Sequence, residues 1–158
     1  MTSEDLEEAL LQAARAARDE RLNLGLEYTS EWPMRGRLAI QLARQAEIIK
    51  LERQHIHVDI EYGQETPPDV HKIPGDARID LIVHRRGTQS SNLLAVELKI
   101  DNAKATKVNS VDNDKLLKLT TKCGFRTGIW IRLPRTRAGH PGRYAVYRRH
   151  EKVSLYDL

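Results

Sequence analysis

The fold is decided by two segments, Arg78-Ile-Asp-Leu-Ile-Val-His-Arg-Arg86 and Leu93-Leu-Ala-Val-Glu-Leu-Lys-Ile100. Both are rich in aliphatic and β-branched residues, and residues 87–92 between them contain the glycine, serine and asparagine that are typical of turns. Apart from a few positions, both faces of each segment are apolar, which indicates strands that are covered on both sides. The two segments therefore predict an antiparallel hairpin at the centre of a sheet.

The polar residues Asp80, Glu97 and Lys99 fall on one face of this hairpin, because side chains alternate between the two faces of a strand. If the turn pairs Arg86 with Leu93, Asp80 lies opposite Lys99. A register shifted by two residues places Asp80 opposite Glu97 instead. In both registers the Cβ atoms of the three residues are about 5 to 8 Å apart. A shift by one residue would separate them, and it would also scramble both apolar faces.

Such a grouping suits a divalent metal ion. Two carboxylates about 5 Å apart repel each other by roughly 3 kcal/mol at an effective dielectric constant near 20, and Lys99 offsets only part of this. Mg²⁺ prefers oxygen ligands and commonly uses one or two carboxylates together with water and a substrate phosphate. It lowers the pKa of a bound water and stabilises charge in the transition state of hydrolysis. The alternative, a cross-strand salt bridge on a half-exposed hairpin, fits the apolar strands less well.

Helices and further strands are expected around the hairpin. Residues 4–21 repeat apolar side chains at helical spacing, and a second helix is expected after Ser30. Strands are expected at 55–62, 127–133 and 144–148, and a third helix from near Ser110. The apolar stripe of the second helix is expected to consist of Leu38, Leu42, Ala46 and Ile49. The order of the elements predicts an α/β protein with one mixed central sheet flanked by helices.

Asp80 and the run Glu97-Leu98-Lys99 resemble the motif of the PD-(D/E)xK phosphodiesterase superfamily, which includes restriction endonucleases and nucleases of DNA repair and recombination. That superfamily has an αβββαβ core, and the order of elements over residues 30–133 is similar. The resemblance implies a single nuclease-like domain, 1–158, with a restriction-endonuclease-like fold. Residues 1–29 would add an N-terminal helix, and residues 134–158 a basic loop and strand. Ile79 stands where the family name has proline, at a position that varies in the superfamily.

The resemblance also implies a function. It makes the chain a metal-dependent nuclease that hydrolyses phosphodiester bonds, of DNA rather than RNA, with Mg²⁺ or Mn²⁺ as cofactor. Asp80 and Glu97 would bind the metal, Leu98 would add its carbonyl oxygen, and Lys99 would be the catalytic lysine. The alternative is a catalytically inactive module that keeps the fold and binds nucleic acid or a protein partner. Homodimerisation is common in similar enzymes and is left open by the sequence.

Similar nucleases take a further acid from the first core helix. Glu31 is the first candidate, because it lies seven residues before Leu38 and therefore on the core-facing stripe. Its alternative role is that of a first-turn acid, which is favourable to the helix dipole. Glu61 is the second candidate, since it lies on the polar face of the strand before Asp80, where it would alternatively be solvated.

Basic residues beyond the motif are candidates for contact with nucleic acid. Lys115, near the start of the third helix, could reach a phosphate, as basic residues on this helix do in similar proteins. Arg135, Arg137 and Arg143 belong to an arginine-, glycine- and proline-rich loop that suits backbone contact, although a solvated loop explains it equally well. Asp112 is interpreted as an ordinary acid in the first turn of the third helix.

The composition is that of a small intracellular domain. The chain has 158 residues and a net charge of +4, with basic residues concentrated after Gly124. That bias suits a polyanionic partner, and a solvated basic surface is an equal alternative. Cys123 is the single cysteine, which excludes an internal disulfide framework. Because no apolar run could span a bilayer and residues 1–8 do not resemble a signal peptide, we expect a cytoplasmic protein that does not bind membranes.

Overall fold

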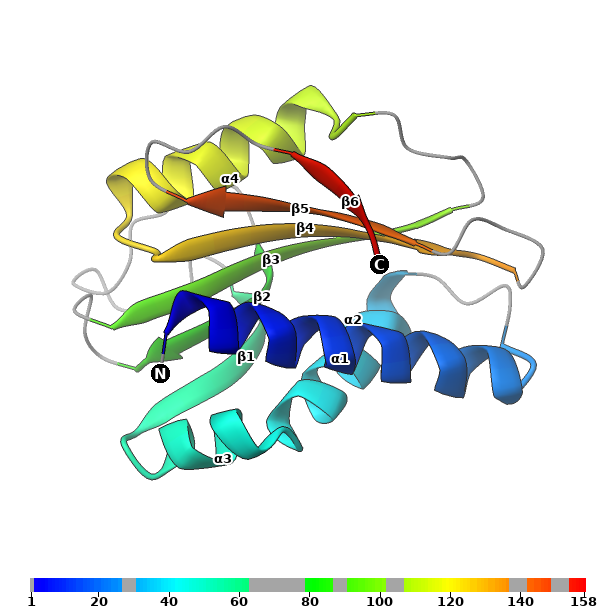
Figure 1. Ribbon diagram of the computed structural model, residues 1–158, viewed down its shortest axis with the longest axis horizontal. Helices are drawn as coiled ribbons and strands as arrows, with labels where there is room; N and C mark the ends of the chain where they lie inside the picture. Colours follow the sequence, from blue (N-terminus) through cyan, green and yellow to red (C-terminus); the bar gives the residue numbers. More distant parts are fainter. Residues whose placement is uncertain are drawn as a thin grey trace.

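Within the residues that the structure describes, six strands form one mixed sheet with helices on both faces (Figure 1). The computed structural model describes residues 2–26, 31–62, 79–86, 91–101, 107–136, 142–148 and 154–158, without the side chains at 32, 47, 61, 62 and 101. The helices are α1 (Ser3–Asn23), α2 (Glu31–Ala43), α3 (Ala46–Glu52) and α4 (Ser110–Lys122). The strands are β1 (Ile56–Tyr62), β2 (Ile79–Arg85), β3 (Asn92–Asp101), β4 (Thr127–Pro134), β5 (Arg143–Arg148) and β6 (Leu155–Asp157). The predicted α/β class, with a mixed sheet flanked by helices, is confirmed.

The central hairpin of β2 and β3 forms in the second of the two predicted registers. Leu81 pairs with Val96 and Val83 with Leu94, so the next step along the ladder sets Asp80 opposite Glu97. The register with Asp80 opposite Lys99 is wrong. It assumed that Arg86 pairs with Leu93, whereas next to the turn His84 pairs with Asn92 and the Arg85 N–H donates to the Ser91 carbonyl.

Strands β3 and β4 run parallel, and α4 makes the crossover between them. Asn109 caps α4, because its side-chain oxygen accepts the backbone N–H of Asp112 at 2.9 Å. Gly128 lets β4 approach this helix closely, since a Cβ atom there would lie 3.2 Å from Leu116 Cδ2 and 3.3 Å from Thr120 Cγ2. The crossover therefore fixes the start of α4 beside the end of β3.

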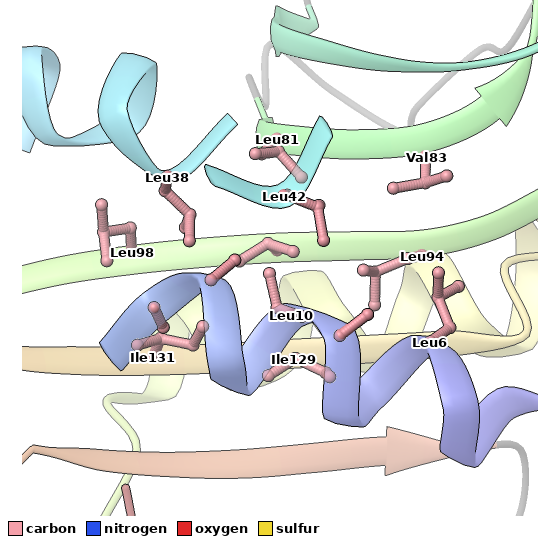
Figure 2. Close-up of a cluster of buried hydrophobic side chains, with 14 of the residues drawn as sticks. Leu6, Leu10, Leu38, Leu42, Leu81, Val83, Leu94, Leu98, Ile129 and Ile131 are labelled. Atoms are coloured by element: carbon pink, nitrogen blue, oxygen red, sulfur yellow. The ribbon is translucent and has the colours of Figure 1, made fainter. Parts of the chain in front are cut away.

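Two apolar layers hold the helices to the sheet. The first lies under α1 and α2 and includes Leu10, Leu38, Leu94 and Ile129 (Figure 2). The second lies under α4 and includes Leu116, Leu119, Trp130 and Tyr147. Each fully buried leucine contributes about 1.5–3 kcal/mol to folding. The helices are thereby fixed on both sides of the central hairpin.

The second predicted helix is in fact two helices. The helix is interrupted at residues 44 and 45, and α3, which begins at Ala46, turns a different set of positions toward the core. The predicted stripe is therefore wrong beyond Leu42: Ile48 is buried, whereas Ala46 is exposed and Ile49 is 43% exposed. Strand β6 was not predicted, because three residues are too few to show a period. No helix in the described ranges is long and apolar enough to cross a membrane.

Candidate active site

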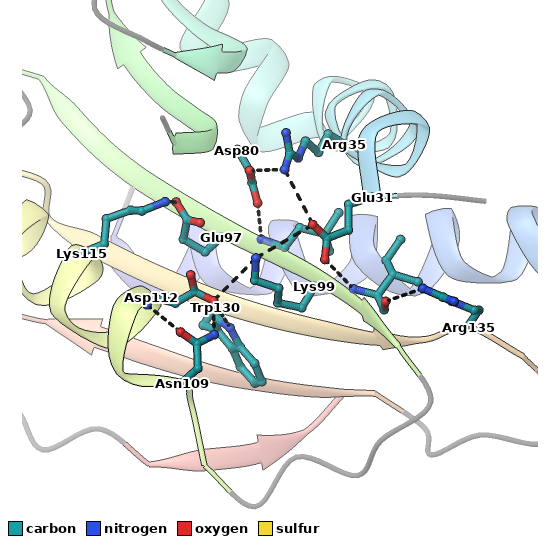
Figure 3. A network of polar contacts seen from close by, with 12 residues as sticks. Glu31, Arg35, Asp80, Glu97, Lys99, Asn109, Asp112, Lys115, Trp130 and Arg135 are labelled. Carbon is teal, nitrogen blue, oxygen red and sulfur yellow. Dashed lines mark hydrogen bonds and ion pairs between the residues drawn. The ribbon is translucent and has the colours of Figure 1, made fainter. Parts of the chain in front are cut away.

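Charged side chains from four elements meet at the end of the sheet where β2 begins and β3 ends (Figure 3). They are the acids Glu31, Asp80, Glu97 and Asp112 and the bases Arg35, Lys99 and Lys115, and we call this group the polar network. Helix α2 supplies its residues from one side of the sheet and α4 from the other. The network thus includes all three motif residues that the sequence predicted.

Asp80 is buried and has a partner at each of its oxygen atoms. Oδ2 accepts the backbone N–H of Leu98 at 2.8 Å, and Oδ1 lies 2.8 Å from Arg35 Nη2. Burial raises the pKa of Asp80, against the lowering effects of the Leu98 N–H and of Arg35. The position across from β3 thus keeps this carboxylate in an environment that disfavours its charge.

The pKa of Glu97 is shifted more strongly than that of Asp80. Its side chain is 2% exposed, and its Oε1 accepts a hydrogen bond from Lys115 Nζ at 2.7 Å. Burial, and then the carboxylate of Asp80, raises the pKa of Glu97 to about 7, although Lys115 acts in the opposite direction. Asp80 and Glu97 therefore form a buried pair of acids that lacks full compensation for two negative charges.

Lys99 lies on the same face of β3 as Glu97 but contacts other acids. Its Nζ is 3.9 Å from Glu31 Oε2 and 4.0 Å from Asp112 Oδ2, and the side chain is 33% exposed. These separations are longer than hydrogen bonds. The ammonium group is therefore held between two carboxylates without being fixed to either one.

Glu31, the first candidate for a further acid from the first core helix, lies in the network. Its Oε1 accepts the backbone N–H of Ile100 at 3.3 Å, and its Oε2 lies 3.8 Å from Arg35 Nη2. Leu98 and Ile100 turn their N–H groups to the side of β3 on which β2 pairs, near the place where β2 begins. The carboxylates of Asp80 and Glu31 satisfy these two groups.

Two members of the network were not identified from the sequence. Arg35 lies one turn after Glu31 on α2, a spacing that could have suggested a shared face. Asp112 does cap α4 with Asn109, but its Oδ2 also accepts the Trp130 Nε1–H at 3.1 Å and faces Lys99. In the sequence, Trp130 could have pointed to this role of Asp112, because a buried tryptophan needs an acceptor for its N–H.

The remaining candidates lie in different places. Lys115 bonds Glu97, and Arg135 donates a 3.5 Å hydrogen bond to the Ile100 carbonyl at the margin of the network. Arg143 is away from the network and pairs with Asp157 of β6 at 3.1 Å. Arg137 and the side chain of Glu61 lie outside the described residues.

Asp80, Glu97 and the Leu98 carbonyl are the oxygen donors that suit a divalent ion such as Mg²⁺. In an extended strand the N–H and C=O of one residue point the same way, so the Leu98 carbonyl is directed toward Asp80 as its N–H is. In the described part of the chain, no three His, Cys, Asp or Glu side chains form a metal-binding group. An ion would have two carboxylates here, which is a number that Mg²⁺ commonly uses. It would also have to compete with Arg35 and Lys115.

Known proteins give no guide to the chemistry of the polar network, so a function has to be argued from its side chains. No model of a known family, no curated protein and no solved structure matches this chain.

Proposed function

We propose that this protein is a metal-dependent nuclease that hydrolyses phosphodiester bonds of DNA with Mg²⁺ or Mn²⁺ as cofactor. The observation that carries the proposal is the meeting of two buried carboxylates, Asp80 and Glu97, with Lys99 at one end of β3. The element order from α2 to β4 supports a restriction-endonuclease-like core, with α3 as an addition. A cytoplasmic location and homodimerisation stay predictions.

Asp80, Glu97 and the Leu98 carbonyl would hold the ion. When bound, the ion makes a water more acidic and stabilises the negative charge that develops on the phosphate. The carboxylates favour a cation because their charges are poorly compensated, as the pKa of about 7 for Glu97 reflects. In the metal-free protein Arg35 and Lys115 offset part of this charge, and a bound ion would take over that role and leave both side chains beside the phosphate oxygens.

Lys99 would act on the attacking water. It is partly exposed, and its contacts with Glu31 and Asp112 are long, so the ammonium group can turn toward a substrate without breaking a short hydrogen bond. There it orients the water and stabilises the charge on the phosphate. Glu31 and Asp112 keep Lys99 at the end of β3.

Cleavage assays test this proposal. Plasmid, single-stranded and branched DNA, with RNA for comparison, are incubated with Mg²⁺, Mn²⁺ or EDTA. We expect metal-dependent cleavage that falls at least about 100-fold in Asp80→Asn and Lys99→Ala, because both contribute to transition-state stabilisation. Asp114→Asn and Lys118→Ala, exposed changes on α4, are the matched controls. Cleavage that persists unchanged in both site variants would come from a contaminant and would remove the proposal.

A second candidate function is a catalytically inactive module that binds nucleic acid or a protein partner. The ion pairs of Arg35 with Asp80, at 2.8 Å, and of Lys115 with Glu97, at 2.7 Å, favour it, because they neutralise the acids without a metal. This candidate predicts salt-dependent binding of DNA without cleavage, and no metal affinity at the carboxylates. Calorimetric titration with Mn²⁺ separates the two: binding that Glu97→Ala abolishes favours the nuclease.

A further inference from the structure

A cavity of about 500 Å³ lies at the opposite end of the sheet from the polar network. Strand β2 connects the two regions, since it carries Asp80 near its start and Arg85 at its end, about 17 Å away at ~3.3 Å per residue. The cavity is lined by α1, α3, the starts of β1 and β3, the end of β2 and the residue before β4. Its volume is in the range of sites for small organic ligands.

The floor of the cavity is apolar. Four lining residues from four different elements, Leu6, Leu51, Ile56 and Leu93, are each between 3% and 6% exposed. They belong to the core layer beneath α1 and are therefore fixed by packing. Such a floor suits a flat, poorly hydrated group such as a ring system.

The rim of the cavity is basic. Lys50, Arg85 and Arg126 line it, and Asp5 is the single acid among the lining residues. Asp5 is already engaged at the start of α1, where its Oδ2 accepts the Thr2 backbone N–H at 2.7 Å. Three positive charges against one engaged negative charge make the rim attractive to an anion.

Arg85 is positioned before any ligand arrives. Its backbone N–H donates to the Ser91 carbonyl at 3.2 Å, and its Nη2 donates to the Gln54 carbonyl at 3.2 Å. Its Nε is buried and has no hydrogen-bond partner among the described residues. The guanidinium group thus lines the cavity, held by one hydrogen bond, and a guanidinium carries further N–H donors that can bind an acceptor.

The rest of the rim carries neutral polar groups. Ser3, Gln54 and Ser91 line the cavity beside the basic residues. A ligand with only an alkyl chain and an acidic head would leave these groups unused. An anionic ligand with hydroxyl groups and a hydrogen-bonding ring would use the apolar floor, the basic residues and the neutral polar groups together.

We propose that this cavity binds a nucleoside phosphate, with the base over the apolar floor, the phosphate at Arg85 and Arg126, and the sugar at the polar rim. The proposal does not depend on the nuclease activity, because the cavity and the polar network share no residue. A mononucleotide bound here would occupy the protein at a distance from the proposed cleavage site.

Calorimetric titration tests the proposal, with AMP, GMP, CMP and UMP as probes in the presence of EDTA. EDTA removes binding that a metal at the polar network would mediate. We expect saturable binding of at least one nucleotide, weakened at least tenfold by Arg85→Gln and at least threefold by Arg126→Gln. Arg44→Gln, an exposed arginine outside the cavity, and Asp80→Asn are the matched controls and should leave the affinity unchanged.

Three results would overturn the proposal: no saturable binding at millimolar nucleotide, equal affinity in wild type and both arginine variants, or inorganic phosphate binding as tightly as the nucleotide. A 5′-phosphorylated oligonucleotide that binds when no mononucleotide does would also overturn it, in favour of a strand end. Thermal unfolding checks that each variant is folded. If Arg85→Gln unfolds, Arg126→Gln and Lys50→Gln decide, because both of these side chains are exposed.

Discussion

Asp59 on β1 and Asp80 on β2 both contact an arginine, yet their pKa values move in opposite directions. Asp59 Oδ2 lies 2.8 Å from His84 Nε2, and Arg86 contacts both oxygens of the same carboxylate. The hydrogen bond with His84, and then that from Arg86, holds the pKa of Asp59 well below its usual range. Burial instead raises the pKa of Asp80, despite its contact with Arg35.

The difference shows that an ion pair by itself does not identify a structural acid. Asp59 has two basic partners, which compensate its charge. Asp80 is more deeply buried and faces Glu97, whose own pKa the Asp80 carboxylate raises further. Buried acids whose charges remain poorly compensated are candidates for functional sites. We therefore propose a chemical role for Asp80 and Glu97, and a structural role for Asp59.

The largest expected effect is on cleavage. Glu97→Gln should lower metal-dependent DNA cleavage at least about 100-fold, because it removes a proposed metal ligand and its charge. Asp59→Asn should leave the cleavage rate within about threefold of wild type, because Asp59 stays outside the polar network. Initial rates on plasmid DNA measure both. A cleavage defect in Asp59→Asn as large as that in Glu97→Gln would break the comparison.

The next effect is on metal affinity. A divalent ion must replace the proton of Glu97, whose pKa is about 7, so Mn²⁺ affinity should rise with pH and level off above this value. Between pH 5 and pH 6, well below that pKa, the rise should be about tenfold for one proton released. Calorimetry at several pH values measures this rise, with Asp59→Asn as the control that should follow the same curve. An affinity independent of pH would contradict the role of Glu97.

In the metal-free protein Asp59→Asn should lower the stability more than Glu97→Gln does, which is the opposite of their order in cleavage. Asp59→Asn leaves the buried His84 and the exposed Arg86 with a weaker partner and should destabilise the fold by about 2 kcal/mol. That loss lowers Tm by about 4–8 °C for a chain of this size. Glu97→Gln should cost less, because it removes a charge that burial disfavours. Thermal unfolding followed by circular dichroism compares the two, and a larger loss in Glu97→Gln would contradict the assignment.

The smallest expected effect is the pH dependence that Glu97 gives to the stability of the metal-free protein. The folded protein holds the Glu97 proton up to about pH 7, whereas the ordinary pKa of a glutamate is 4.5. The stability from this group is therefore fully present below 4.5 and is lost as the pH rises through 7. Between pH 6 and pH 7 the loss should be on the order of 1 kcal/mol. Denaturant unfolding of wild type and Glu97→Gln at both values measures it, and equal slopes in the two proteins would refute the perturbed titration.

For Asp59, the change of stability with pH has the opposite sign. Its depressed pKa stabilises the fold above pH 3.8, the ordinary pKa of an aspartate, and this stability is lost as the pH falls toward the lower pKa of the folded protein. Acid unfolding of wild type against Asp59→Asn should show the difference below pH 4, where Glu97 is protonated in both states.

Much of the fold was readable from short-range patterns. Alternation along the hairpin predicted that Glu97 and Lys99 share a face, and helical spacing placed Glu31 toward the core. The register was not readable, because alternation excludes a shift by one residue but not a shift by two, and the pairing of His84 with Asn92 beside the turn decides between the two. The phase of α3 was missed for a similar reason, since the break at residues 44–45 carries neither glycine nor proline.

The site was readable only in part, because its members meet through tertiary packing. Arg35 reaches Asp80 across a gap of 45 positions in the sequence, and Lys115 reaches Glu97 from a helix on the other face. No period or spacing encodes either contact. The motif therefore predicts which acids meet, but it does not predict which bases neutralise them.

The carboxylates of Asp80 and Glu31 accept the N–H groups of Leu98 and Ile100, which a neighbouring strand would accept in a regular sheet. An open N–H group at the side of a strand can pair with another chain, and an acid that accepts this group prevents such pairing. Asparagine at position 80 keeps an oxygen that can accept from Leu98, whereas alanine leaves that group open. We therefore expect inactivating substitutions at this end of β3 to differ in solubility. Isosteric substitutions such as Asp80→Asn keep the Leu98 N–H bonded and should remain the more soluble.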